Sequence, residues 1–173
     1  AEDAARSEID FLTAAMEAAI SAGATMITIC DTAGTMMPDE FKAFIEELYH
    51  RVPTLSQIAL SVQCADALNV AAACSIQAVQ AGAANIKASS SSGTYATLAA
   101  AANIIRHRGD ALGLHCNLKF TEMQRIIGQI NWITQTRRAQ STPFENGANN
   151  SNVQISLDKH DTLEAVIKAI HQL

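Results

Sequence analysis

The chain has 173 residues, enough for one domain with a hydrophobic core and too few for two ordinary domains. Hydrophobic residues make up 49% and charged residues 17% of the sequence, which excludes a disordered tail or a collagen-like chain. The net charge of −5 comes without a basic stripe, and this argues against nucleic-acid binding. No run of about 20 apolar residues is present, so we expect no transmembrane helix.

The four cysteines lie far apart, at Cys30, Cys64, Cys74 and Cys116, and none of them forms a C-x-x-C pair. This spacing favours reduced thiols in a cytoplasmic protein over a disulfide framework or a zinc site. The acidic, polar first residues do not resemble a signal peptide. A start without methionine suggests a piece of a longer protein.

Helical and strand patterns alternate along the chain. Helices are expected over residues 7–22, 38–51, 67–81, 95–107, 120–137 and 161–172. Strands are expected over residues 25–30, 57–63, 85–88 and 111–116, and a loop over 141–152. Ser7 is expected to cap the first helix with Asp10 completing a capping box, and Gly23 to end it. The strand over 25–30 is apolar on both faces, as in a sheet buried between layers.

An Ala-Gly-Ala triplet precedes two of the expected strands, and the two copies lie 59 residues apart, close to two β/α units. Alternating β/α units imply a parallel sheet with outer helices. Three or four such units predict the C-terminal half of a TIM (β/α)8 barrel, with a small doubly wound sheet as the alternative. We expect a partial barrel domain over 1–140 and a linker with the start of a helical subdomain over 141–173.

In a parallel barrel the chemistry lies at the carboxyl ends of the strands. The chain carries polar residues at four such places: 2–3, 31–32, the end of the strand over 57–63, and 89–93. The stretches there and nearby read EDAARS at 2–7, DTAG at 31–34, SVQCAD at 61–66 and AVQAGA at 78–83.

In order and spacing these stretches resemble the α-isopropylmalate synthase and homocitrate synthase family. That family belongs to the DRE-TIM metallolyase group, which also includes hydroxymethylglutaryl-CoA lyase. The likeness runs from residue 2 to about residue 100, and residues 156–173 more weakly resemble the linker subdomain that follows the barrel. It implies a cytoplasmic, oligomeric acyltransferase of amino-acid biosynthesis that condenses acetyl-CoA with a 2-oxo acid.

The resemblance also implies a divalent metal held by an Asp of the first strand, two His spaced as H-x-H, and an Asn one strand later. In this chain Gln63 and Ala65 stand at the His positions, and Thr94 falls near the Asn position. Asp66 is one step along the strand and therefore faces the other way. The Arg-Asp pair of the family's first strand would precede Ala1. We therefore expect no metal cofactor for this chain.

By the same resemblance Glu2 aligns with an acid near the reacting centre, and Thr32 with a contact to the substrate carboxylate. A Glu at the second residue of a chain is more often a solvated chain end, and Thr32 is more often a turn former. Three hypotheses follow. The chain is the C-terminal half of a condensing enzyme, a non-catalytic paralogue that binds, assembles or regulates, or a half barrel that lends Glu2 and Thr32 to an active site completed elsewhere.

The exposed edges of a half barrel predict that the chain does not act alone. The expected partner is the missing N-terminal half barrel or a second copy of the chain, with acetyl-CoA and a 2-oxo acid as inherited ligands. No nucleic-acid or membrane partner is expected. His115 and Cys116 would end the expected fourth strand as a buried pair facing opposite sides. The apolar stripe is read as core or interface first and as a ligand pocket second; it consists of Met123, Ile126, Ile127, Ile130 and Trp132.

Overall fold

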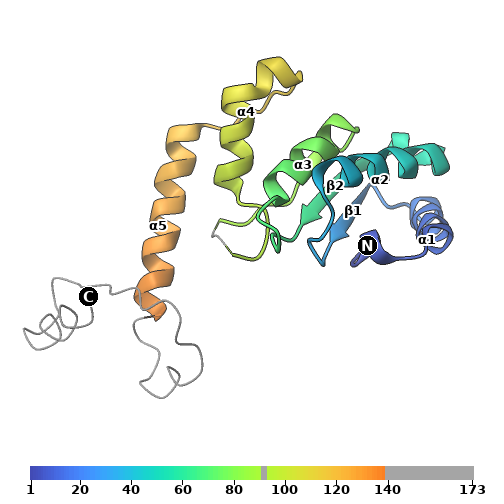
Figure 1. Ribbon diagram of the computed structural model, residues 1–173, viewed down its shortest axis with the longest axis horizontal. Coiled ribbons are helices and arrows are strands. Elements are labelled where there is room, and N and C mark those ends of the chain that lie inside the picture. Colours follow the sequence, from blue (N-terminus) through green and yellow to red (C-terminus); the bar gives the residue numbers. More distant parts are fainter. Residues whose placement is uncertain (91–92, 139–173) are drawn as a thin grey trace, which may run out of the picture. The chain divides into compact units, whose positions relative to one another are not determined.

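The computed structural model describes residues 1–90 and 93–138 (Figure 1). The chain divides into two compact units, Ala1–Ile133 and Thr134–Leu173. The first unit is described below, together with the bounds of the helix that enters the second. The loop expected over 141–152 and the helix expected over 161–172 lie outside the described residues, and the domain boundary expected at residue 140 stays a prediction.

Helices and strands alternate through the described part of the chain. The helices are α1 (Ile9–Ser21), α2 (Pro38–Arg51), α3 (Ala71–Gln80), α4 (Leu98–Leu112) and α5 (Phe120–Arg138), with 3₁₀ turns at Ala4–Arg6 and Pro53–Gln57. The strands are β1 (Met26–Asp31), β2 (Ala59–Cys64) and β3 (Asn85–Ile86). They form one parallel sheet in the order β1-β2-β3. This is the arrangement predicted for consecutive β/α units.

Helix α2 has the predicted bounds because both of its ends carry strong local signals. Pro38 occupies the first helical position, where no backbone hydrogen bond is lost. The Glu40 carboxylate accepts a hydrogen bond from the Met37 N–H at 2.8 Å, which satisfies one of the free amides at the helix start. Phe41 and Ile45 lie on one face of the helix and are fully buried.

The start of α1 differs from the prediction. The helix begins at Ile9, and no side chain caps it. The Ser7 hydroxyl instead donates to the Asp3 carbonyl at 2.9 Å, because the preceding residues turn into a 3₁₀ helix. Phe11, expected on the apolar stripe, is 74% exposed. The helix ends as predicted, with Gly23 in the left-handed region at φ 100°.

The two faces of the sheet differ in burial: within this chain, the strand expected to lie buried between layers is covered by helices on one face only. Figure 1 shows α2 and α3 side by side above the strands. Beneath them Ile27 and Ile29 are buried, whereas Met26 on the opposite face is 48% exposed. We call this opposite face the inner face. It carries alternate residues of each strand because side chains alternate along a strand.

The first residue of the chain extends the sheet beyond β1. The Ala1 ammonium donates to the Thr28 carbonyl at 2.7 Å, and the Cys30 N–H donates to the Ala1 carbonyl at 3.0 Å. This pairing places residues 2 and 3 at the carboxyl edge of the sheet.

The strand expected over 111–116 does not form. Helix α4 continues to Leu112, five residues beyond the expected end, and Gly113 ends it with φ 67°. The Leu114 N–H donates to the Gly109 carbonyl at 2.9 Å. His115 and Cys116 have no regular secondary structure. The expected strand fails because its first residues complete the last turn of the helix.

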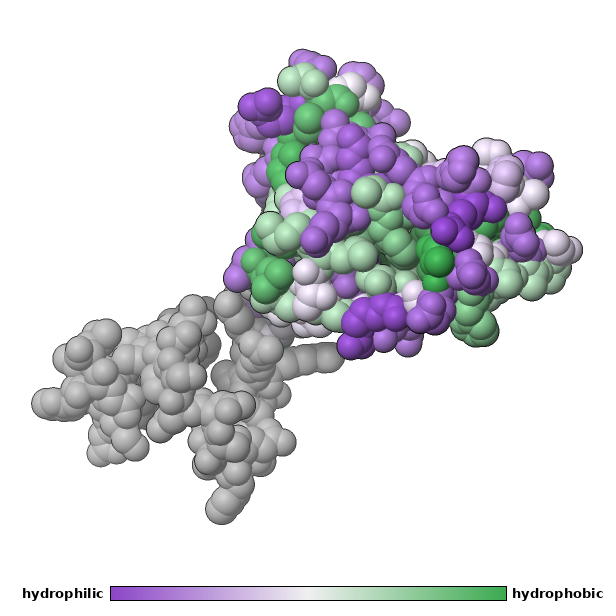
Figure 2. Space-filling model, turned by 45° about the vertical axis from the view of Figure 1, so that its right-hand side comes forward, coloured by the Kyte–Doolittle hydropathy of each residue, from purple (hydrophilic) through white to green (hydrophobic). Residues whose placement is uncertain are grey.

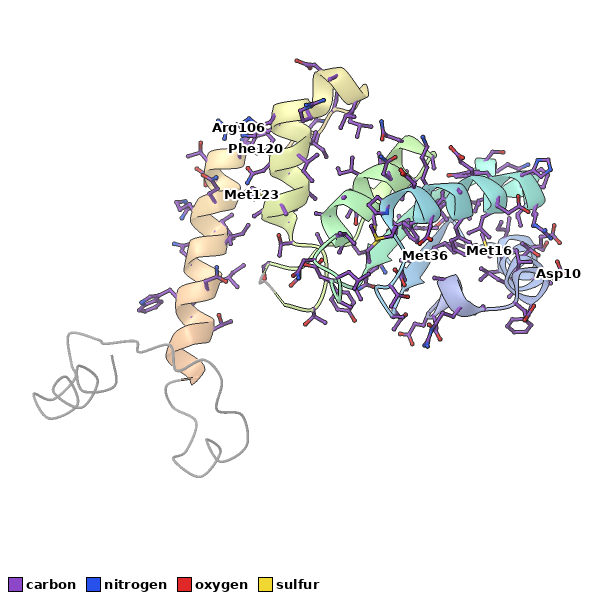
Figure 3. The ribbon with its side chains drawn as sticks, in the orientation of Figure 1. Asp10, Met16, Met36, Arg106, Phe120 and Met123 are labelled. Carbon is purple, nitrogen blue, oxygen red and sulfur yellow. The ribbon has the colours of Figure 1, made fainter. Side chains whose placement is uncertain are left out.

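Helix α5 follows α4 and begins at the predicted residue. The Arg106 guanidinium lies over the Phe120 ring, 5.4 Å from its centre, and Met123 lies about one turn further along α5 (Figure 3). Met123 is buried, but Ile126 is 45% exposed, so only part of the expected stripe is core. Other hydrophobic residues are also exposed, and Figure 2 shows them between hydrophilic ones on one face.

Among the residues that the structure describes, no helix is long and apolar enough to cross a bilayer.

Candidate functional site

The carboxyl ends of three parallel strands meet at one edge of the sheet. β1 ends at Asp31, β2 at Cys64 and β3 at Ile86. The Ala65 N–H donates to the Asp31 carbonyl at 3.0 Å, so the pairing of β1 with β2 continues one residue past the end of β2. In barrels this edge carries the chemistry.

The Asp31 carboxylate holds the turn that follows β1. It is 1% exposed, and its two oxygens accept hydrogen bonds from the Gly34 N–H at 3.0 Å and the Met36 N–H at 3.4 Å. A β-carbon on Gly34 would lie 2.5 Å from the Ala65 carbonyl oxygen, so the turn packs directly against the end of β2. Asp31 is therefore a structural acid that shapes the edge and does not face the inner side.

Thr32 and Glu2, the two candidate site residues retained from the resemblance, lie at the β1 end of this edge. The Thr32 hydroxyl accepts a hydrogen bond from the Asp3 N–H at 2.8 Å, so it ties the first residues of the chain to the loop after β1. Glu2 is exposed. The catalytic role of Glu2 and the substrate contact of Thr32 stay predictions.

An ion pair that the sequence reasoning missed lies beside them. Asp3 and Arg6 form two hydrogen bonds of 2.8 and 2.7 Å, the two-pronged geometry of an arginine with a carboxylate. This contact raises the pKa of Arg6 through the hydrogen bond and the charge of Asp3. Asp3 and Arg6 are three residues apart in the stretch EDAARS, and this spacing could have predicted the ion pair.

Gln63 and Ala65 lie on the same side of their segment, as the H-x-H spacing requires. The residue between them, Cys64, is fully buried on the helix-covered side. The Cys30 thiol donates to the Gln63 side-chain oxygen at a sulfur–oxygen distance of 3.7 Å. Where the resemblance implies two imidazoles, the chain therefore presents an amide in contact with a thiol, and a methyl group.

Asp66 forms hydrogen bonds with the loop and the helix that follow β2. Its carboxylate accepts a hydrogen bond from the Ala71 N–H, the first residue of α3, at 2.9 Å. Its own N–H donates to the Thr94 carbonyl at 3.0 Å. Thr94 thus reaches this edge through its backbone, and its side chain is exposed.

These residues do not fit a divalent metal. An amide oxygen is a feeble ligand, alanine offers none, and catalytic metals in proteins are held by imidazole, carboxylate or thiolate groups. In the part of the chain that the structure describes, no three His, Cys, Asp or Glu side chains gather into a group that could hold an ion.

Two of the thiols are inert for a physical reason. Burial raises the pKa of Cys64 from 9.0 to about 12 and the pKa of Cys74 to about 11. Both therefore stay protonated at neutral pH and are poor nucleophiles. The Cys74 thiol donates to the Met36 carbonyl at 3.4 Å. All four cysteines are unpaired, and Cys30 is the half-buried one at the inner face.

A hollow at the other edge of the sheet is lined by Tyr49, Ser56 and residues near the amino end of β2. The Tyr49 hydroxyl donates to the Gly82 carbonyl at 2.8 Å and closes one side of it. Residues at this edge of a barrel serve stability rather than chemistry.

A parallel sheet with helices packed on one face and a polar carboxyl edge is the arrangement expected for part of a β/α barrel. The chain belongs to the HMGL-like family, whose family model matches residues 1–129.

Its relatives are 2-isopropylmalate synthases. It is 43% identical over 134 residues to the 2-isopropylmalate synthase of Aeromonas hydrophila subsp. hydrophila, a match that covers 75% of this chain and 26% of that protein. It is 38% identical over 138 residues to that of Pelotomaculum thermopropionicum, covering 78% and 27%. The chain thus spans about a quarter of the length of the relatives it matches.

Solved structures share the fold. The Bacillus subtilis HMG-CoA lyase matches with a TM-score of 0.58 at 18% identity, covering 75% of this chain and 44% of that one. The carboxyl transferase domain of Rhizobium etli pyruvate carboxylase, solved with pyruvate, matches with a TM-score of 0.54 at 22% identity, covering 69% and 20%. The predicted partial TIM barrel is confirmed.

Proposed function

We propose that this chain is part of a 2-isopropylmalate synthase-type barrel that does not carry out the metal-dependent condensation of acetyl-CoA with a 2-oxo acid. The observation that carries the proposal is the pair Gln63 and Ala65 at the carboxyl edge. Two imidazoles at these positions would point to one ion, because residues two apart on a strand face the same side. An amide and a methyl group do not bind a cation in this way.

Three neighbouring acids, Asp31, Asp66 and Asp3, support the same reading because each is already bonded to another group of the chain. Asp31 is buried and accepts two backbone hydrogen bonds in the turn. Asp66 accepts one from the start of α3, and Asp3 is paired with Arg6. A metal would polarise the keto group of the substrate, an effect worth several kcal/mol, and the described residues offer no ligand set for it.

A non-catalytic role in binding or assembly is the second candidate. It is favoured by the polar inner face, which keeps hydrogen-bonding groups although the metal positions have changed. The expected partners, the remaining half barrel or a second copy of the chain, stay predictions, as do acetyl-CoA and a 2-oxo acid as ligands.

The test is metal binding by the full chain, measured by equilibrium dialysis against Zn²⁺ or Mn²⁺ with elemental analysis. Thiol release from acetyl-CoA in the presence of 2-oxo acids is measured in parallel. We expect less than one bound ion per chain and no thiol release. One tightly bound ion per chain together with turnover would contradict the proposal.

The double variant Gln63→His/Ala65→His sharpens the test. We expect it to bind Zn²⁺ more tightly than either single variant, because only the double variant places two imidazoles on one side of the segment. The single variants are the matched controls, since each adds one histidine at the same edge. Equal affinity in all three would show that these two positions do not share an ion site.

A further inference from the structure

A short segment from the loop before α4 pairs with the carboxyl end of β2. The Ala96 N–H donates to the Cys64 carbonyl at 3.0 Å, and the Asp66 N–H donates to the Thr94 carbonyl at 3.0 Å. We call this segment, residues 94–97, the strap. Its backbone continues the hydrogen bonding of β2 beyond the last residue of that strand.

The strap also lies between the end of β2 and the residues that follow β3. The Ser89 N–H donates to the Ala96 carbonyl at 2.9 Å, and the Leu98 N–H donates to the Ser89 carbonyl at 2.8 Å. The last residue of the strap, Thr97, caps α4, because its hydroxyl accepts a hydrogen bond from the Ala100 N–H at 3.2 Å. The strap is therefore fixed on both sides and at its far end by hydrogen bonds.

The strap places the side chains of Ala65 and Tyr95 next to each other. The two residues form an antiparallel bridge, and the two hydrogen bonds to β2 flank this bridge without joining the two residues themselves. This is the non-hydrogen-bonded kind of antiparallel pair, in which the two β-carbons are about 4.5–5.5 Å apart.

Both side chains belong to the inner face of the sheet. Cys64 and Ala96 are buried in the core on the helix-covered side, and neighbouring side chains along an extended backbone point to opposite faces. Ala65 and Tyr95 therefore point to the inner face. The other inner-face residues of this part of the sheet form two polar rows: Thr28, Ser61 and Asn85, then Cys30, Gln63 and Lys87.

The burial of Tyr95 shows how its ring lies on this face. The inner face is open within this chain, where Met26 is 48% exposed and Lys87 is exposed. Tyr95 is nevertheless half-buried. A ring that projected away from an open face would be exposed, so the Tyr95 ring lies against the sheet.

We propose that Tyr95 is a built-in cover that closes the carboxyl end of the inner face over Ala65. The backbone of the strap holds the ring in place, so the cover is set by the fold and needs no ligand. An ion or small molecule that approaches β2 from this end meets an aromatic ring beside the methyl group. The inference depends on the pairing of the strap and holds whether or not the chain binds a metal, so it goes beyond the proposed function.

The test measures how fast a thiol next to Tyr95 reacts with iodoacetamide. Ala65→Cys places the thiol beside the ring, and the full chain is labelled, digested and analysed by mass spectrometry to follow position 65 alone. We expect slow labelling in Ala65→Cys and at least several-fold faster labelling in Ala65→Cys/Tyr95→Ala. Equal rates in the two variants overturn the proposal.

Ala59→Cys is the matched control for this measurement. Ala59 is also a half-buried inner-face alanine of β2, but it lies at the first residue of the strand, away from the strap. Tyr95→Ala should leave the labelling rate at position 59 unchanged. An equal increase at positions 59 and 65 overturns the proposal, because the ring would then support the whole fold and not cover Ala65.

Tyr95→Phe separates the ring from its hydroxyl. We expect Ala65→Cys/Tyr95→Phe to be labelled as slowly as Ala65→Cys, because the ring supplies the cover; fast labelling overturns the proposal. The exposed acid Glu2 lies at the same edge and can change the pKa of a nearby thiol. It is present in every variant, so its effect cancels when the rates are compared. Metal dialysis measures the proposed function separately, so failure of either proposal is distinguishable from failure of the other.

Discussion

Replacement of Gly34 by alanine tests how the edge of the sheet is built. Gly34 has φ 64°, and a β-carbon there would lie 2.5 Å from the Ala65 carbonyl oxygen. Left-handed backbone costs a residue with a β-carbon roughly 1–2 kcal/mol, and overpacking a tight site costs about 1–3 kcal/mol more. We therefore expect Gly34→Ala to lower the free energy of unfolding by about 2–5 kcal/mol.

Gly113 supplies a matched control for this substitution. Its φ of 67° is nearly the same, but a β-carbon there would meet nothing within 4 Å. Gly113→Ala should therefore lower the free energy of unfolding by only the strain of the left-handed backbone, about 1–2 kcal/mol. The free energies of unfolding of both variants are measured by urea unfolding followed by circular dichroism. With a urea slope of about 2 kcal/mol/M, the midpoint for Gly34→Ala should fall about 1–2.5 M below that of the unchanged chain. Equal losses in the two variants would refute the contact between the turn and the end of β2.

Two further predictions concern buried groups near the same edge. Asp31→Asn should lower the free energy of unfolding by about 1–3 kcal/mol, because it leaves one buried N–H of the turn without an acceptor; an unchanged urea midpoint would refute this role. Burial raises the folded-state pKa of Cys64 from 9.0 to about 12, so its contribution to stability is complete below pH 9 and is lost as the pH rises toward 12. Stability should therefore fall between these values, and Cys64→Ala should remove up to about 1.4 kcal/mol per pH unit of that slope. Parallel slopes for the two chains would contradict the raised pKa.

Local signals predicted the elements well where they were strong. Pro38 fixed the start of α2, and Gly23 fixed the end of α1. The expected strand over 111–116 failed because its apolar residues also fit the last turn of α4. The Ser7 cap failed because its hydroxyl is used by the preceding turn. A pattern of a few residues cannot show which of two neighbouring elements a residue joins, or which of two nearby groups its side chain bonds.

The site was predicted in part. The loss of the two imidazoles could be predicted from the stretch SVQCAD at 61–66. Gln63 and Ala65 occupy the two positions that the family resemblance assigns to His. The use of the Thr32 hydroxyl by Asp3 was not visible, because the two residues are 29 apart and meet only when the start of the chain pairs with β1.

The sequence by itself determined the alternation of strands and helices, the family, and the residue types at the metal positions. Each of these depends on patterns within a few residues or on their order. Only the tertiary structure decided that Ser61, Gln63 and Lys87 share one polar face, and that Asp31 turns away from it. It also decided that Ser61 is buried on that face with no hydrogen-bond partner among the described residues. The reason is the register of parallel strands, which joins residues from separate β/α units and is set by packing across the whole sheet.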